Sequence, residues 1–139
     1  NQYKVFTTDI GMLVGMLEDG RTDALLSGNL GMGKGMLYEA LIADALYKRG
    51  GRLFYFARES RLELDFVIND LGDSTILEVK ARDGNSKSAK TVMAHPDHYG
   101  KTQLIRIKDS NISENNGILT LPHYMAHLLF KWSATLPAD

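Results

Sequence analysis

Two carboxylates and a lysine are spaced along one predicted β-hairpin so that they could act together on a metal ion and a phosphate. The stretch ELDFVINDLGDSTILEVK, residues 63–80, contains two strand-like runs joined by the turn NDLGDS. A hairpin centred on this turn sets Asp65 directly opposite Glu78, with their Cβ atoms roughly 5 Å apart. Lys80 lies two residues beyond Glu78 and therefore on the same face of its strand.

The pair Asp65 and Glu78 is destabilising unless something offsets the two like charges. A divalent cation would do so, because hard ions prefer carboxylate oxygens. Two acids beside a lysine suit metal-assisted hydrolysis of a phosphodiester. The metal holds the phosphate and acidifies a water, and Lys80 orients the nucleophile or offsets developing charge. The alternative is a solvent-facing pair of strands with a salt bridge between Glu63 and Lys80.

The same alternation of side chains predicts one apolar and one polar face for this hairpin. The apolar face, expected to meet the core, consists of Leu64, Phe66, Ile68, Leu77 and Val79. The polar face consists of Glu63, Asp65, Val67, Ile76, Glu78 and Lys80. A slip of one residue in the pairing would bury the carboxylates and is therefore disfavoured.

The glycine-rich stretch GNLGMGKG, residues 28–35, is a candidate phosphate-binding loop, since it reproduces most of G-x-x-x-x-G-K-[ST]. Gly35 stands where the motif needs a hydroxyl for Mg²⁺, and the preceding DALLS is too short for a core strand. We therefore favour a flexible entry to the following helix over a nucleotide-binding fragment. That helix carries Glu39 among apolar neighbours.

Hydrophobic periodicity and turn residues predict an α/β domain with a mixed sheet. Helices are expected from Asp9 to near Gly20, at 35–48, at 86–94 and from Pro122 to about Trp132, and strands at 52–57, 63–68, 75–80, 103–108 and 118–121. Residues 20–34 and the stretch SENNG are expected to be loop and turn. Asp9 is the expected N-cap of the first helix.

The candidate residues, in this order of elements, resemble a known superfamily. Glu39 on a helix, then Asp65, then Glu78-Val79-Lys80 resembles the PD-(D/E)XK nucleases, whose core is αβββαβ. The sequence is more closely similar to a prokaryotic domain of unknown function that usually follows an AAA-type P-loop ATPase domain. The matching pieces are YKVFTTDIGML, GKGMLYEALIADAL, FYFARESRLELDFVI and ILEVKAR, to which the strand QLIRIK adds.

The resemblance implies a single restriction-endonuclease-like domain with a mixed central sheet flanked by helices. Residues 1–34 would form an N-terminal helix and glycine-rich loop, 35–108 the nuclease-like core, and 109–139 a short strand and C-terminal helix. It further implies that the chain is the C-terminal part of a larger prokaryotic ATPase, with that ATPase domain as its partner.

For the site, the resemblance implies that Asp65, Glu78 and Glu39 are metal ligands and that Lys80 is the catalytic lysine. Mg²⁺ or Mn²⁺ would be the cofactor and DNA the substrate of this hydrolase. Leu64 stands where the motif name has proline. Because some members keep the fold and have lost catalysis, the alternative is a catalytically inactive nuclease-like module that binds DNA or protein for the ATPase.

Composition limits the function classes further. With no cysteine, the chain has no disulfide and no thiolate metal site. It has no apolar run long enough to cross a membrane and no visible signal peptide, so we expect a cytoplasmic protein that does not contact membranes. The net charge is −1, but residues 80–108 hold seven basic and two acidic residues, a local excess that permits contact with phosphates.

Two histidine pairs are weaker candidates for a metal site. HPDH holds His95 and His98, and HYMAH holds His123 and His127 at a spacing that shares a helix face. The glutamate of H-E-x-x-H is absent, so we disfavour zinc and expect His127 to be a packing residue. Apolar residues near the C-terminus are expected to pack a helix onto the sheet or to dock on a partner domain: Tyr124, Leu128, Leu129 and Trp132.

Overall fold

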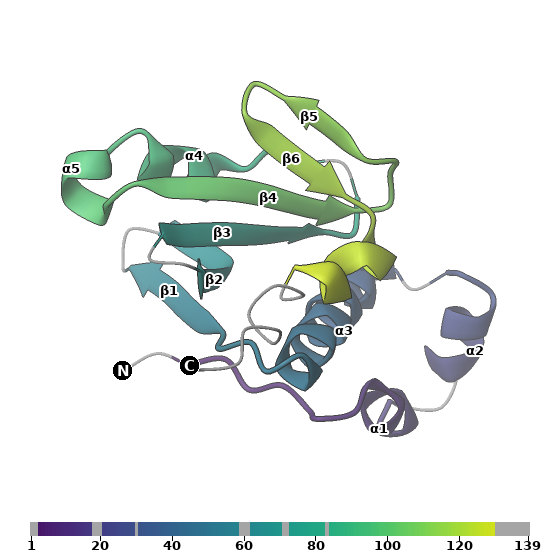
Figure 1. Ribbon diagram of the computed structural model, residues 1–139. Helices are drawn as coiled ribbons and strands as arrows, with labels where there is room; N and C mark the ends of the chain where they lie inside the picture. The colour runs from purple at the N-terminus through teal and green to yellow at the C-terminus, as the bar shows by residue number, and fades with distance from the viewer. Residues whose placement is uncertain are drawn as a thin grey trace.

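A mixed β-sheet with helices on both faces forms the centre of the molecule (Figure 1). The computed structural model describes residues 3–17, 21–29, 31–58, 62–70, 73–82 and 84–129. Within these ranges the sheet has six strands in the order β1-β2-β3-β4-β6-β5. The strands are β1 (Phe54–Arg58), β2 (Leu62–Asp70), β3 (Asp73–Lys80), β4 (Thr102–Lys108), β5 (Ser113–Asn115) and β6 (Ile118–Leu121).

The strand directions divide the sheet into two parts. β1, β2 and β3 pair antiparallel as a meander, whereas β3, β4 and β6 run parallel, and β5 closes the edge antiparallel to β6. The carboxyl ends of β3, β4 and β6 therefore lie at the same end of the sheet. The expected α/β architecture with a mixed sheet is confirmed.

Each face of the sheet has its own helices and its own core (Figure 1). The helices are α1 (Ile10–Gly15), α2 (Arg21–Leu26), α3 (Lys34–Lys48), α4 (Lys87–Met93) and α5 (Pro96–Tyr99), with 3-10 turns η1 (Gly31–Gly33) and η2 (His123–Leu128). On one face the buried core joins α3 and η2 to the sheet through Ile42, Ala43, Leu46, Phe66, Ile68, Leu77, Val79, Ile107 and Ala126. On the other face α4 packs through Leu64, Ile76, Ala89, Val92 and Leu104.

A β-bulge in β2 overturns the single apolar face expected for residues 63–68. Phe56 pairs with Leu64, but Phe54 pairs with Val67, so β2 has one residue more than β1 between these pairs. The extra residue reverses the alternation of side chains along the strand. As a result Leu64 packs on the α4 side and Phe66 on the α3 side, and the prediction that they share a face is wrong.

Most expected elements are present, with differences at the chain ends and in loops. The helix at 35–48 is α3, and Asp9 caps α1 by accepting a hydrogen bond from the Met12 amide at 2.9 Å. Residues 20–34, expected to be loop, contain α2 and η1. The expected helix from Pro122 begins as the 3-10 turn η2, and its continuation to Trp132 lies outside the described residues.

One further expectation is wrong, and packing of the C-terminal residues on the sheet is met only in part. The SENNG turn begins with strand β5, because β6 offers it a pairing edge, and only Asn116 and Gly117 form the turn. Tyr124 is 75% exposed instead of packed, since η2 turns it away from the sheet, whereas Leu129 does contact the α3-side core. In the part of the chain that the structure describes, no helix has the length and apolarity to span a bilayer.

Candidate active site

The β2–β3 hairpin has the register that the sequence predicts, up to the bulge. Pairs run from Asp70 with Asp73 to Phe66 with Leu77. At the next position the side chain of Asp65 replaces main-chain pairing: its Oδ2 accepts a hydrogen bond from the Val79 amide at 2.8 Å. The carboxylate of Asp65 is therefore fixed against the main chain that immediately follows Glu78.

The environment of Asp65 raises its pKa well above that of a free aspartate. Burial raises the pKa of Asp65 to about 6, against the opposing effect of the hydrogen bond from Val79. The nearby negative charge of Glu39 raises this pKa further, and the charges of Lys4 and Lys80 lower it. The charges of Glu39 on α3 and of Lys80 on β3 thus both act on the pKa of Asp65. A perturbed pKa among charged neighbours fits a functional position.

Glu78 and Lys80 form a close ion pair at the end of β3. Lys80 Nζ lies 2.6 Å from Glu78 Oε1, and the Glu78 side chain is only 12% exposed. Leu77 and Val79 pack toward α3, so alternation places Glu78 and Lys80 on the α4 side of the sheet. The alternative salt bridge between Glu63 and Lys80 is replaced: Lys80 pairs with Glu78, and Glu63 pairs with Lys4.

A buried oxygen of Glu78 has no partner among the described residues. Glu78 Oε2 is buried without a hydrogen bond, and so is Nε of Arg106, the register partner of Glu78 on β4. Nη2 of the same guanidinium donates to Ser86 Oγ at 2.9 Å. Buried polar atoms are normally satisfied, so a water or a ligand atom between Glu78 and Arg106 would meet the needs of both.

Lys4 is a member of the site that the sequence analysis missed. Its ammonium lies 3.0 Å from Glu39 Oε2 and 3.0 Å from Glu63 Oε1, and 5.1 Å from the centre of the Tyr55 ring. Burial by itself would lower the pKa of Lys4, but the hydrogen bonds to the two glutamates raise it overall. A lysine near the start of the chain gives no local signal that it contacts residues 35 and 59 positions away; the only hint is its place in YKVFTTDIGML.

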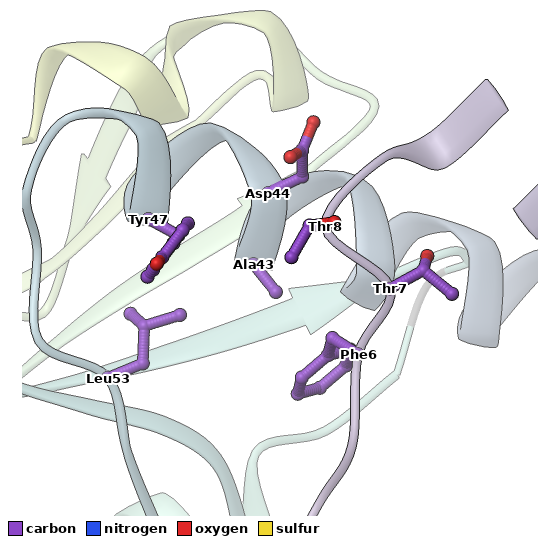
Figure 2. Close-up of a pocket in the computed structure, with 7 residues that line it drawn as sticks. All are labelled: Phe6, Thr7, Thr8, Ala43, Asp44, Tyr47 and Leu53. Atoms are coloured by element: carbon purple, nitrogen blue, oxygen red, sulfur yellow. The ribbon is translucent and has the colours of Figure 1, made fainter. Parts of the chain in front are cut away.

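The N-terminal segment that carries Lys4 is packed along α3. The Phe6 ring lies 5.5 Å from the Phe66 ring. A cavity of about 330 Å³ lies between this segment, α3 and the residue before β1. Its lining, drawn in Figure 2, is Phe6, Thr7, Thr8, Ala43, Asp44, Tyr47 and Leu53. These contacts hold the segment so that Lys4 reaches Glu39 and Glu63.

The structure brings the four expected site residues together only in part. Asp65 is close to Glu39 and Lys80, and Lys80 contacts Glu78. Glu39, however, comes from α3, on the opposite face of the sheet from Glu78, and Lys4 neutralises it. Within the described ranges no group of three or more His, Cys, Asp or Glu side chains is arranged to hold a metal ion.

A smaller donor set remains. Mg²⁺ commonly uses one or two carboxylates together with waters and substrate phosphates. Asp65 and Glu78 are the pair that could act this way, because Asp65 accepts a hydrogen bond from the amide of Val79, the residue after Glu78, and Glu78 Oε2 is buried without a partner among the described residues. Glu39 does not fit while Lys4 holds it.

The histidines do not converge in the described structure. His95 and His127 each bond a main-chain oxygen one turn away through Nδ1, that of Thr91 at 2.8 Å and that of Tyr124 at 2.7 Å. His127 is partly buried, as expected, and His123 packs as well: its ring stacks on Tyr38 with centroids 3.9 Å apart.

Comparisons with known proteins place the chain in a family without assigning an activity. No curated protein and no solved structure matches the chain. A protein-family comparison matches residues 34–124, well over half of the sequence. The matched range includes Glu39, Asp65, Glu78 and Lys80 and begins after Lys4. The chain belongs to the family described as Domain of unknown function (DUF4143).

Proposed function

We propose that the chain is a nuclease-like domain with a metal-dependent site for phosphodiester hydrolysis at the end of the β2–β3 ladder. The observation that carries the proposal is the bulge in β2, which fixes Asp65 against the Val79 amide beside the ion pair of Glu78 and Lys80. The succession α3, β1, β2, β3, α4 and β4 corresponds to the αβββαβ order, which supports a restriction-endonuclease-like arrangement.

Each residue has a distinct task in this proposal. Asp65 and Glu78 would hold Mg²⁺ or Mn²⁺, which when bound would supply a polarised phosphate and an acidified water. Lys80 would hold a phosphate oxygen or the attacking water through its ammonium, once that ammonium moves from Glu78 toward the substrate. Glu39 would complete the acidic set only when Lys4 releases it.

A cleavage assay tests this function. Plasmid and branched DNA are incubated with Mg²⁺ or Mn²⁺ and wild-type protein, Glu78→Gln or the matched control Glu114→Gln, which changes an exposed glutamate on β5. Loss of one ligand is expected to lower the rate at least roughly a hundredfold in Glu78→Gln and not in the control. Equal cleavage by all three proteins would show that the activity does not come from this site.

The ion pairs of Lys4 favour a second candidate function, a nuclease-like module without catalysis that binds DNA or protein for an attached ATPase domain. Lys4 already neutralises two glutamates near Asp65, as a metal would do in an active site. This candidate predicts no cleavage with any metal and DNA binding that is lost on charge reversal at Lys87 and Lys90. Cleavage that depends on Glu78 would exclude it.

A further inference from the structure

Three parallel strands end at the same edge of the sheet, beside the candidate active site. Lys80 is the last residue of β3 and Lys108 the last of β4, and the two are register partners. β6 ends at Leu121, two residues before His123. Ligand sites in α/β proteins form outside the carboxyl ends of parallel strands, because the loops that follow these strands leave a crevice there.

A small polar cavity lies at this edge. Its volume is about 200 Å³, and it is lined by Lys80, Ala81, Arg82, Lys108 and Asp109; we call it the basic pocket. Three cationic side chains and one carboxylate line it, and Lys80 also contacts Glu78, so the lining carries more positive than negative charge. The volume is below the roughly 300–1,000 Å³ of pockets that take drug-sized ligands, so a small anionic group fits better than a nucleobase.

His123 lies near two residues that line the basic pocket, Lys80 and Asp109. Burial lowers the pKa of the His123 imidazole, against the opposing effects of the Lys80 main chain and the charge of Asp109. The imidazole Nε2 is buried without a partner among the described residues. Tyr38 stacks on the His123 ring, and Lys34 Nζ lies 5.5 Å from the centre of the Tyr38 ring. The His123 ring is therefore held in place by stacking.

We propose that the basic pocket binds a phosphate group of a nucleic acid, next to the phosphate that is cut at the Glu78–Lys80 pair. Arg82 would supply a planar fork for two phosphate oxygens, and Lys108 a point charge. Lys80 lines the pocket and contacts Glu78, so two consecutive phosphates of one strand could lie on either side of it. The choice of a nucleic acid as the parent molecule rests on the proposed function.

Binding without metal tests the pocket separately from catalysis. Fluorescence anisotropy with a labelled single-stranded oligonucleotide, with a 5′-phosphate or a 5′-hydroxyl, compares wild type, Arg82→Gln/Lys108→Gln and Arg49→Gln/Lys101→Gln. The control variant also removes one arginine and one lysine, at exposed positions outside the pocket. We expect the pocket variant to bind at least roughly tenfold more weakly and the control variant clearly less so.

The salt dependence gives an independent readout. Losing the neutralisation of one phosphate should flatten the slope of log affinity against log salt by about 0.7 for a single strand. A preference for the 5′-phosphate that disappears in the pocket variant would show that the pocket binds a terminal phosphate. An equal loss of affinity for both oligonucleotides would show that it binds an internal phosphate. Inorganic phosphate should compete with the oligonucleotide for wild type and more weakly for the pocket variant.

Two outcomes would contradict phosphate binding in the basic pocket. One is an equal loss of oligonucleotide affinity in the pocket and control variants. The other is no loss of affinity in a pocket variant whose melting temperature shows that it is folded. Phosphopeptide binding as tight as oligonucleotide binding would overturn the choice of a nucleic acid. The result is separable from the proposed function, because DNA cleavage that Glu78→Gln leaves unchanged removes the function and leaves phosphate binding standing. DNA cleavage that depends on Glu78, together with unchanged oligonucleotide binding by the pocket variant, supports the function and removes the pocket.

Discussion

The carboxylate of Asp65 takes a ladder position on β3 by accepting the Val79 amide proton at 2.8 Å. A side chain of β2 thus does what a main-chain carbonyl does elsewhere in the hairpin. The bulge beside it makes this substitution possible, because the extra residue turns the Asp65 side chain toward β3 instead of to one face. The Asp65 carboxylate is thus held in place by β3, and its burial in that position raises its pKa.

Asp65→Asn should make the protein more stable at neutral pH. The pKa of Asp65 is 3.8 without its surroundings and about 6 in the folded state. A raised carboxyl pKa stabilises the folded state below about pH 4, and this contribution is lost as the pH rises through about 6. Above that, wild type carries a penalty of at most about 3 kcal/mol, which asparagine avoids while still accepting the Val79 hydrogen bond.

Urea unfolding of wild type and Asp65→Asn at pH 4.0 and pH 7.5 measures this. The free energies of unfolding should agree at pH 4.0 and favour the variant at pH 7.5. Asp97→Asn, at an exposed aspartate in α5, should match wild type at both pH values. A variant that is less stable than wild type at pH 7.5 would contradict the assignment of a buried, costly charge.

Lys4→Met should destabilise the protein at neutral pH. The substitution keeps most of the apolar stem and leaves Glu39 and Glu63 without their shared cation, close to Asp65. We expect a loss of about 1–2 kcal/mol, since both pairs are partly open to solvent. The loss should shrink in acid, where carboxylates take up protons, and in millimolar Mg²⁺, which can replace the lysine charge.

Thermal melts with and without Mg²⁺, at pH 4 and pH 7.5, test this, with Lys101→Met as the control for losing an exposed lysine. If Lys4→Met melts with wild type at pH 7.5, the ion pairs contribute nothing. If Mg²⁺ stabilises the variant no more than wild type, the lysine does not stand in for a divalent cation.

Local sequence signals were sufficient for the hairpin and for α3. The turn at NDLGDS and the alternation beyond it predict the pairs from Phe66 with Leu77 to Asp70 with Asp73, because register follows from the turn and the apolar pattern. The long periodic run after Gly33 predicts α3. Asp65, Glu78 and Lys80 could be grouped as candidates because they belong to that single well-specified hairpin.

The sequence did not predict the contacts that tertiary structure decides. The bulge at Asp65 depends on how β1 pairs with β2, and no glycine marks it. The ion pair between Lys4 and Glu39 connects residues that are far apart in the chain. The hairpin of β5 and β6, by contrast, had a local signal: Asn116-Gly117 is the favoured dipeptide of a two-residue hairpin turn.

Gly117→Ala should destabilise that hairpin for backbone reasons alone. Gly117 has φ of 71°, which an L-residue adopts at a cost of roughly 1 kcal/mol, and a Cβ there would meet no atom within 4 Å. The melting temperature should fall by a few degrees. Gly35→Ala is the control: it lies in α3 with equal open space and no positive φ, so alanine should raise stability slightly. A rise for both variants would contradict the turn geometry.

Metal affinity should fall steeply in mild acid if Asp65 is a ligand. A proton on Asp65 competes with Mn²⁺, and with a pKa of about 6 this carboxyl is largely ionised at pH 7.5 but mostly protonated at pH 5.5. Titration calorimetry with Mn²⁺ should therefore show several-fold weaker binding at pH 5.5, whereas a carboxylate with an ordinary pKa would change little over this range. Glu78→Gln should bind more weakly at both pH values. Binding that is independent of pH and unaffected by Glu78→Gln would exclude a metal at this hairpin. In that case Asp65 would not release a proton when the ion binds, and Glu78 would not exchange Lys80 for the ion.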